Sequence, residues 1–131
     1  HFNRIAVVRD YQEELPTVWS DPSLLRQVFQ NLILNAMTAI RKDGEIALET
    51  RASKEGVAVR VTDTGPGIPE DHIQKIFDPL FTTRPEGMGL GLSISADILQ
   101  KLGGRLSVKN EPGKGASFTV ELPLEFKPST S

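Results

Sequence analysis

The hydrophobic positions along this chain repeat with two periods, and each period predicts one kind of element. Alternation with period two is typical of half-buried strands, and a spacing of three and four residues is typical of an amphipathic helix. The turn at 53–56 separates two alternating segments, which favours a hairpin, and the turn at 111–115 separates two more. Five segments alternate and are predicted to be strands: 4–9, 45–50, 57–63, 105–110 and 116–123.

The longest helical pattern lies in the first third of the chain. Asp21 is predicted to be an N-cap, with Pro22 at the first helical position. From residue 25 onward, apolar side chains recur at three-four spacing as far as Ile40. The segment 41–44 adds two basic residues and a glycine, so we expect a helix with a basic last turn and a glycine stop.

Two further helices and a loop are predicted in the second half of the chain. Pro69 and the two acidic residues after it open a short helix that runs through Phe77. Residues 92–102 form a full helix that ends at a pair of glycines. Residues 78–91 contain two prolines and three glycines without a sustained period, which predicts a loop running into the helix start.

The order of these elements predicts the architecture. Mostly antiparallel strands need helices to cover one face, so we expect a two-layer α/β sandwich. A chain of 131 residues, 38% of them hydrophobic, suits one globular domain over residues 1–131. Residues 124–131 are predicted to be a flexible tail.

Composition narrows the possible classes of function. A net charge of −2 with both signs interspersed argues against extended nucleic-acid binding, which needs a basic surface. The absence of cysteine removes disulfides, thiolate metal sites and cysteine nucleophiles, and it fits a cytoplasmic setting in which any metal has oxygen ligands. No apolar run reaches the ~20 residues of a membrane span and no signal peptide is visible, so we expect a soluble domain without membrane contact.

An aspartate closes one of the predicted strands on its apolar side. Residues 57, 59, 61 and 63 share a parity, so Asp63 points where Val57, Val59 and Val61 point. A charge aimed at a core needs a partner. The segment DTGPGIP, residues 63–69, therefore contains a carboxylate that the strand alone does not explain.

Two asparagines lie four residues apart on the long predicted helix. At roughly 100° per residue, Asn35 is only about 20° from the direction of Val28, so Asn31 and Asn35 border the apolar stripe. Asparagine lowers helix stability and needs partners when half buried, which favours the wall of a polar pocket. A surface or capping asparagine beside a satisfied core amide is the alternative interpretation.

Five of the 11 glycines lie in two short segments. Gly65 and Gly67 follow a predicted strand, and Gly87, Gly89 and Gly91 precede a predicted helix. Glycine lets the backbone approach a ligand closely, and N–H groups at a helix start attract anions, so the second segment is a candidate phosphate-binding element. An ordinary flexible loop is the alternative, and the spacing matches neither a P-loop nor the dinucleotide fingerprint.

Four segments in order, QVFQNLILNAMTAI, DTGPGIP, FDPLFTTR and GMGLGLSI, resemble the four sequence boxes of the sensor histidine kinase catalytic domain. This is the ATP-binding module shared with gyrase, heat-shock chaperones and mismatch-repair proteins. The likeness spans residues 5–123 and is greatest to nitrogen-regulator type kinases, whose lid is short. It implies a Bergerat-type ATP-binding fold with a mixed, mostly antiparallel sheet, and ATP and Mg²⁺ as cofactors.

The resemblance assigns roles to individual residues. Asp63 would accept a hydrogen bond from the adenine amino group, and the two glycines after it would let the backbone approach the base. Asn35, with Asn31 beside it, would hold the magnesium ion through a side-chain carbonyl. The catalytic residues that the resemblance implies are Asn31, Asn35 and Arg84. Arg84 would lie in a mobile lid and meet the β- or γ-phosphate. The residues that the resemblance assigns to nucleotide binding are Asn31, Asn35, Asp63, Gly65, Gly67, Ile68, Phe77, Thr82, Thr83, Arg84, Gly87, Met88, Gly89, Leu90, Gly91 and Leu92.

Asn31 also bears on the choice between kinase and hydrolase. In the hydrolysing branch of the family a glutamate stands at this position and polarises the attacking water, and an amide cannot act as a general base. The resemblance therefore implies transfer of the γ-phosphoryl group to an external acceptor. Neither His1 nor His72 is followed by the acidic residue and proline-containing stretch of the family's acceptor histidine.

The acceptor histidine is therefore expected on separate dimerisation helices, which would join the domain near residues 1–10. A response-regulator aspartate would take the phosphoryl group next, and the isolated domain would be a monomer that binds Mg-ATP and turns over little. Two other classes stay open, an anti-sigma-type serine kinase and a noncatalytic nucleotide-sensing module of the same fold. A purely structural protein would need neither glycine segment nor Asp63.

Overall fold

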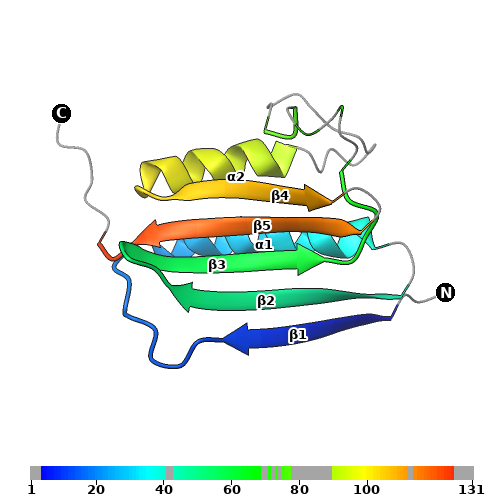
Figure 1. Ribbon diagram of the computed structural model, residues 1–131. Coiled ribbons are helices and arrows are strands. Elements are labelled where there is room, and N and C mark those ends of the chain that lie inside the picture. The colour runs from blue at the N-terminus through cyan, green and yellow to red at the C-terminus, as the bar shows by residue number, and fades with distance from the viewer. Residues whose placement is uncertain are drawn as a thin grey trace.

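A single sheet with helices on one face makes up the part of the chain that the structure describes (Figure 1). The computed structural model describes residues 4–40, 43–68, 71, 73, 75–77, 90–111 and 114–125. Its elements are β1 (Ile5–Tyr11), α1 (Pro22–Ala39), β2 (Gly44–Ala52), β3 (Gly56–Asp63), α2 (Leu90–Lys101), β4 (Arg105–Glu111) and β5 (Gly115–Pro123).

The sheet is mixed, with the strand order β1-β2-β3-β5-β4. β1 and β2 are parallel and are joined through α1, since parallel neighbours need a crossover connection, and the other three pairs are antiparallel. All five predicted strands form, each with ends within two residues of the prediction. The predicted two-layer α/β sandwich is confirmed.

The hydrophobic core lies between the two helices and one face of the sheet. Side chains directly opposite each other on neighbouring strands point to the same face, and Val61 in β3 lies opposite Leu48 in β2 and Phe118 in β5. These rows of side chains pack against the apolar stripes of α1 and α2. The most deeply buried side chains are Val28, Leu32, Ile46, Val61, Ser95, Leu99, Leu102 and Val120.

The beginning of α1 agrees with the prediction, but its end does not. Asp21 caps the helix, because its Oδ1 accepts a hydrogen bond from the Leu24 N–H at 3.0 Å. The helix ends at Ala39, and Ile40 is extended and buried. Gly44 is the first residue of β2 rather than a helix stop, so the predicted basic last turn is wrong. Burial of Ile40 in the core outweighs the local preference of residues 41–44 for a helix end. Residues 41–42 lie outside the described residues.

The short helix predicted for residues 69–77 is not found where the structure describes this segment. Residues 71, 73 and 75–77 form turns. Isolated helices of this length are marginal, so tertiary packing decides their conformation, and here Ile76 is buried in the core with Phe77 packed against it. The next helix begins at Leu90, two residues before its predicted start, and residues 78–89 of the predicted loop lie outside the described ranges.

The beginning of the predicted C-terminal tail is tied to the domain. The Trp19 N–H donates to the carbonyl oxygen of Leu124 at 2.8 Å, and Trp19 and Glu125 form a parallel bridge. Residues 126–131 lie outside the described part of the chain. Neither helix in the described ranges is long and apolar enough to cross a membrane.

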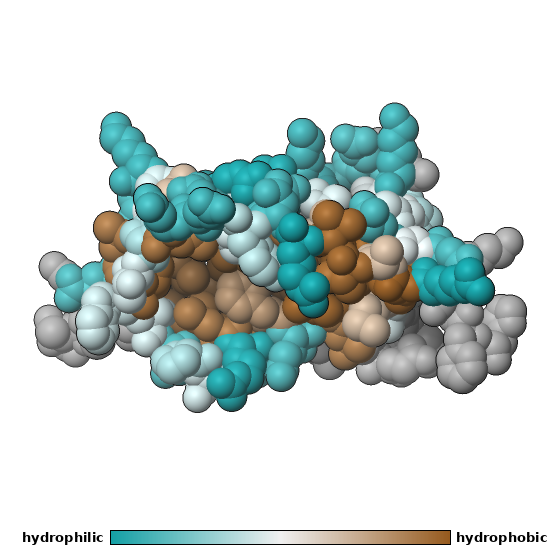
Figure 2. Space-filling model, turned by 90° about the horizontal axis from the view of Figure 1, so that it is seen from below, coloured by the Kyte–Doolittle hydropathy of each residue, from teal (hydrophilic) through white to brown (hydrophobic). Residues whose placement is uncertain are grey.

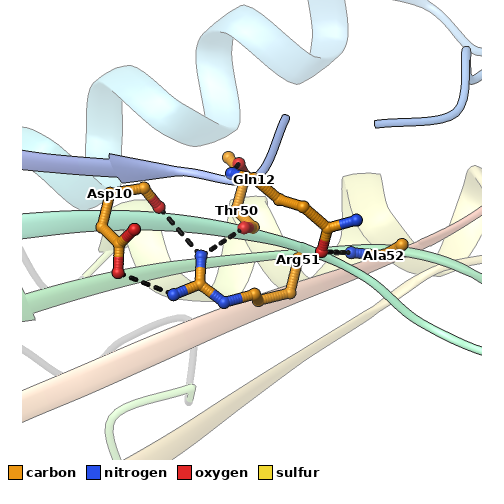
Figure 3. A network of polar contacts seen from close by, with 5 residues as sticks. All are labelled: Asp10, Gln12, Thr50, Arg51 and Ala52. Atoms are coloured by element: carbon orange, nitrogen blue, oxygen red, sulfur yellow. Dashed lines mark hydrogen bonds and ion pairs between the residues drawn. The ribbon is translucent and has the colours of Figure 1, made fainter. Parts of the chain in front are cut away.

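Side chains extend the pairing of β1 with β2 beyond the end of β1 (Figure 3). The Gln12 N–H donates to Thr50, and the Gln12 Oε1 accepts from the Ala52 N–H at 2.8 Å. Beside it, an Arg51 guanidinium nitrogen lies 2.6 Å from the Asp10 carboxylate. The hydrogen bond to Asp10 raises the pKa of Arg51. Both side chains of the ion pair are exposed, so the pair aligns the strand ends more than it stabilises them.

The apolar interior reaches the surface at the β1 edge. Figure 2 looks at this edge and shows a hollow with apolar side chains between the sheet layer and the helix layer. Ile46 in β2 is buried and Leu48 is half-buried, whereas Val7 in β1, which lies opposite Ile46 on the same face, is 45% exposed. The core is therefore deepest under β3 and β5 and thins out toward β1.

Candidate functional site

The predicted site residues that the structure describes gather at one end of the molecule. The end of β3, the C-terminal end of α1 and the N-terminal end of α2 all lie at the right-hand end of Figure 1. Gly65 sits so close to the last residue of α1 that a Cβ added to it would lie 2.9 Å from the Ala39 carbonyl oxygen. Near the middle of both helices, a hydrogen bond between Asn31 and Ser95 joins α1 to α2.

Asp63 is the last residue of β3 and points into the core. It is 6% exposed and lies opposite Ile46, which is 1% exposed. This confirms the direction that strand parity predicted. Its Oδ1 accepts a hydrogen bond from the Gly65 N–H at 2.8 Å, which closes a tight turn directly after the strand. A carboxylate has about four acceptor positions, so this turn leaves capacity for further hydrogen bonds.

The turn after Asp63 depends on glycine at position 65. A Cβ there would lie 2.9 Å from the Ala39 carbonyl oxygen, closer than real Cβ atoms come, and 3.0 Å from Asp63 Oδ1, which is tighter than most real contacts. Gly67 has a φ of 79°, in the left-handed region that favours glycine. The backbone at Gly65 thereby lies close to both the carboxylate and the end of α1.

Asn110 holds the far end of this segment, and none of the predicted site residues included it. The Ile68 N–H donates to Asn110 Oδ1 at 2.7 Å, and Asn110 Nδ2 donates to the Ile68 carbonyl oxygen at 2.6 Å. Asn110 lies in β4 on the same face as Leu106 and Val108, which pack against the core. Apolar residues alternate here as they do before Asp63, so the sequence pattern also places Asn110 on the core side of its strand.

Asn31 and Asn35 border the buried stripe of α1, as predicted. Both are half-buried, and they flank Leu32 and Ala36, which are buried. Asn31 Nδ2 lies 3.4 Å from Ser95 Oγ in α2, and the Ser95 side chain is fully buried. Asn35 Nδ2 is buried and makes no hydrogen bond to any described residue. An amide in this position is available to a ligand, and the cost of leaving it unpaired favours one.

The remaining predicted residues divide into those that the structure places and those outside its described ranges. Leu90 and Gly91 form the first turn of α2, Leu92 is buried in the core, and Phe77 packs against that core. No group of three His, Cys, Asp or Glu residues that could hold a metal ion occurs among the described residues. The predicted site residues outside the described ranges are Thr82, Thr83, Arg84, Gly87, Met88 and Gly89.

Comparison with known proteins identifies the fold family. Residues 20–126 match the family described as histidine kinase-, DNA gyrase B-, and HSP90-like ATPase. The chain belongs to this family. The catalytic domain of histidine kinase ThkA, solved in a nucleotide-free form, superposes with a TM-score of 0.83 and 34% identity over 92% of this chain and 80% of that one. Full-length ShkA, solved in complex with AMPPNP, matches with a TM-score of 0.82 and 33% identity over 95% of this chain and 27% of that one.

The curated relatives are sensor kinases, and this chain matches one part of each. The sensor histidine kinase ZraS of Escherichia coli strain K12 is 44% identical over 114 residues, which cover 87% of this chain and 24% of ZraS. The signal transduction histidine-protein kinase AtoS of the same strain is 38% identical over 122 residues, covering 92% of this chain and 20% of AtoS. The chain is thus a histidine kinase-type catalytic ATPase domain that spans about a quarter or less of these relatives' length.

Proposed function

We propose that this domain binds Mg-ATP and donates the γ-phosphoryl group to a histidine on a separate dimerisation and phosphoacceptor domain. A response-regulator aspartate would then take the phosphoryl group. The observation that carries the proposal is Asp63, a carboxylate 6% exposed at the end of an apolar strand, with a turn directly after it that requires glycine at position 65. Burying a charge at the end of an apolar strand is costly, so a protein that does this has a use for the charge.

The adenine end of the pocket is set by Asp63 in this proposal. The adenine amino group is a donor and matches a carboxylate oxygen, whereas guanine presents a carbonyl oxygen at the same place. Two acceptors facing each other in a buried site lose their hydrogen bonds to water without replacing them, at ~1–3 kcal/mol. The domain is therefore expected to select ATP over GTP.

The phosphate end would lie toward α1 and α2. Asn35 fits a Mg-nucleotide because none of the described residues pairs with its buried amide nitrogen, so no contact in the described part of the chain holds the side chain away from a ligand. Its carbonyl oxygen is the kind of ligand that Mg²⁺ takes beside phosphate oxygens and water. When bound, the ion would neutralise phosphate charge. The N–H groups at the start of α2, at Leu90 and Gly91, would face the same phosphates. Arg84 would be the basic side chain that pairs with these phosphates.

Transfer to an acceptor fits this site better than hydrolysis. Asn31 has an amide where a water-activating base would be needed, and its Nδ2 is directed to Ser95 Oγ. The protein's part in phosphoryl transfer is then to position the reactants and balance charge. The names of the relatives favour a histidine over a serine acceptor. We place the reaction in the cytoplasm, with the acceptor helices and the response regulator as partners and the isolated domain as a monomer.

Calorimetry followed by a transfer assay tests the proposal. Titration with a nonhydrolysable ATP analogue should show binding that magnesium strengthens and that the matching GTP analogue does not reproduce. With ATP labelled in its γ-phosphate and a helical acceptor domain that carries a histidine, the labelled phosphoryl group should reach the acceptor and be released by acid. An acid-stable product would indicate a hydroxyl acceptor and contradict the histidine assignment, and a folded domain that binds no nucleotide would overturn the proposal altogether.

A further inference from the structure

Asn110 makes a two-point hydrogen-bonded contact with a single backbone residue. Its carbonyl oxygen accepts from the Ile68 N–H at 2.7 Å and its amide nitrogen donates to the Ile68 carbonyl at 2.6 Å. One side chain thus satisfies the donor and the acceptor of one residue, as a neighbouring strand would. The two residues are 42 positions apart in the chain and partly buried. Both hydrogen bonds are short: the 2.7 Å distance is at the lower end of the usual N···O range, and the 2.6 Å distance is just below it.

The place of this contact relates it to Asp63. Asn110 lies opposite Ala116 near the start of β5, and β5 is the strand that pairs with β3. The segment from Asp63 to Ile68 is therefore held at both ends, by the hydrogen bond from Gly65 to Asp63 and by the contact with Asn110. Between these two points Pro66 fixes its own φ and Gly65 lies against the end of α1, but neither Gly65 nor Gly67 has a side chain that would hold the backbone.

We propose that Asn110 is a positioning residue for nucleotide binding. It touches no ligand; it holds the backbone of residues 65–68 in the conformation that meets the base. The proposal rests on the proposed function, because it assigns that backbone to the adenine end of the same pocket. Without Asn110, the segment would have to be ordered when the nucleotide binds, and this entropic cost lowers affinity. The loss should be roughly tenfold and equal for ATP and ADP, since both have the same base.

Two variants of Asn110 separate the hydrogen bonds. Asn110→Ala removes both, and Asn110→Asp keeps the acceptor for the Ile68 N–H but places an anion against the Ile68 carbonyl. Ser107→Ala is the matched control, because Ser107 is exposed on the opposite face of the same strand. Calorimetry with ATP and ADP analogues measures affinity, thermal unfolding measures stability, and NMR measures hydrogen exchange at the Ile68 amide with and without nucleotide.

We expect fast Ile68 exchange in nucleotide-free Asn110→Ala and slow exchange again at saturating nucleotide. Affinity for both nucleotides should fall roughly tenfold in the folded variant, while Ser107→Ala behaves like the wild type. A merely structural role would lower the unfolding temperature without coupling Ile68 exchange to nucleotide. Wild-type affinity in Asn110→Ala would overturn the inference and leave the proposed function intact. If the folded wild type bound no nucleotide, both would fail, and the exchange data would then show a purely structural contact.

Discussion

Replacing Asp63 with asparagine isolates one property of the site, the charge and acceptor character of a buried group. The two side chains have the same shape, and the Oδ1 of the introduced asparagine can still accept the hydrogen bond that the Gly65 N–H now donates to Asp63 at 2.8 Å. The turn after β3 should therefore persist. What changes is the second polar atom, which becomes an NH₂ donor and faces the donor of the adenine amino group.

The magnitude follows from the burial of this position. Asp63 is 6% exposed, so neither donor of a mismatched pair can turn to water. The hydrogen bond to a charged acceptor is worth about 1.5–3 kcal/mol, and an unsatisfied buried donor costs about 1–3 kcal/mol more. The lower ends of these two ranges together give a total near ~3 kcal/mol, which corresponds to at least ~100-fold weaker ATP binding, at about 1.4 kcal/mol per tenfold. The stability of the variant is measured beside its affinity, so that only a folded domain is compared with the wild type.

Titration calorimetry with an ATP analogue, combined with thermal unfolding, measures both quantities. Asp97→Asn makes the same chemical change at an exposed position of α2 and should leave the affinity unchanged. An Asp63→Asn domain that is folded and binds the analogue within about threefold of wild type would refute the assignment of Asp63 to the base.

Three further predictions concern the framework of the domain. Asp21→Ala removes the cap of α1 and should lower the free energy of unfolding by about 1 kcal/mol in urea, and an unchanged midpoint would contradict the capping role. Gly115→Ala should cost about 2 kcal/mol or more, because Gly115 has a φ of 132° and its added Cβ would lie 2.0 Å from the Asp63 carbonyl oxygen. Weaker nucleotide binding in the folded fraction should accompany that loss. The pKa of Arg51 is raised in the folded state, so its charge stabilises that state fully below the unfolded pKa, and this stabilisation is lost only as pH rises through the folded pKa. Both pKa values lie above about pH 9, so the urea midpoints of wild type and Arg51→Ala should keep a constant small separation from about pH 7 to about pH 9.

Periodicity along the chain also places two further polar residues, Asn110 and Ser95, on the core side of their elements. The same alternation that aims Asp63 at the core places Asn110 on the core side after Leu106 and Val108. Ser95 likewise falls on the buried stripe of α2, three residues after Leu92, and is fully buried. A polar residue on an apolar face was the available signal in all three cases, because burying it requires partners.

The partners of these polar residues could not be predicted from local pattern. Asn110 meets Ile68 across 42 residues and Asn31 meets Ser95 across 64, distances over which periodicity carries no information. The end of α1 was missed for a related reason. The residue types at positions 41–44 favour a helix end there. The helix instead ends at Ala39, Ile40 is extended and buried in the core, and Gly44 is the first residue of β2.

The sequence by itself determined the two-layer sandwich, the order of the five strands and the two longer helices, and the direction of Asp63, since each follows from the period of apolar residues along a short stretch of chain. Only the tertiary structure decided which backbone each buried polar group contacts, where α1 ends, and that residues 71, 73 and 75–77 form turns rather than a helix. These outcomes depend on the packing of strands and helices far apart in the chain. Packing energies at buried side chains exceed the fractions of a kcal/mol that separate local conformations.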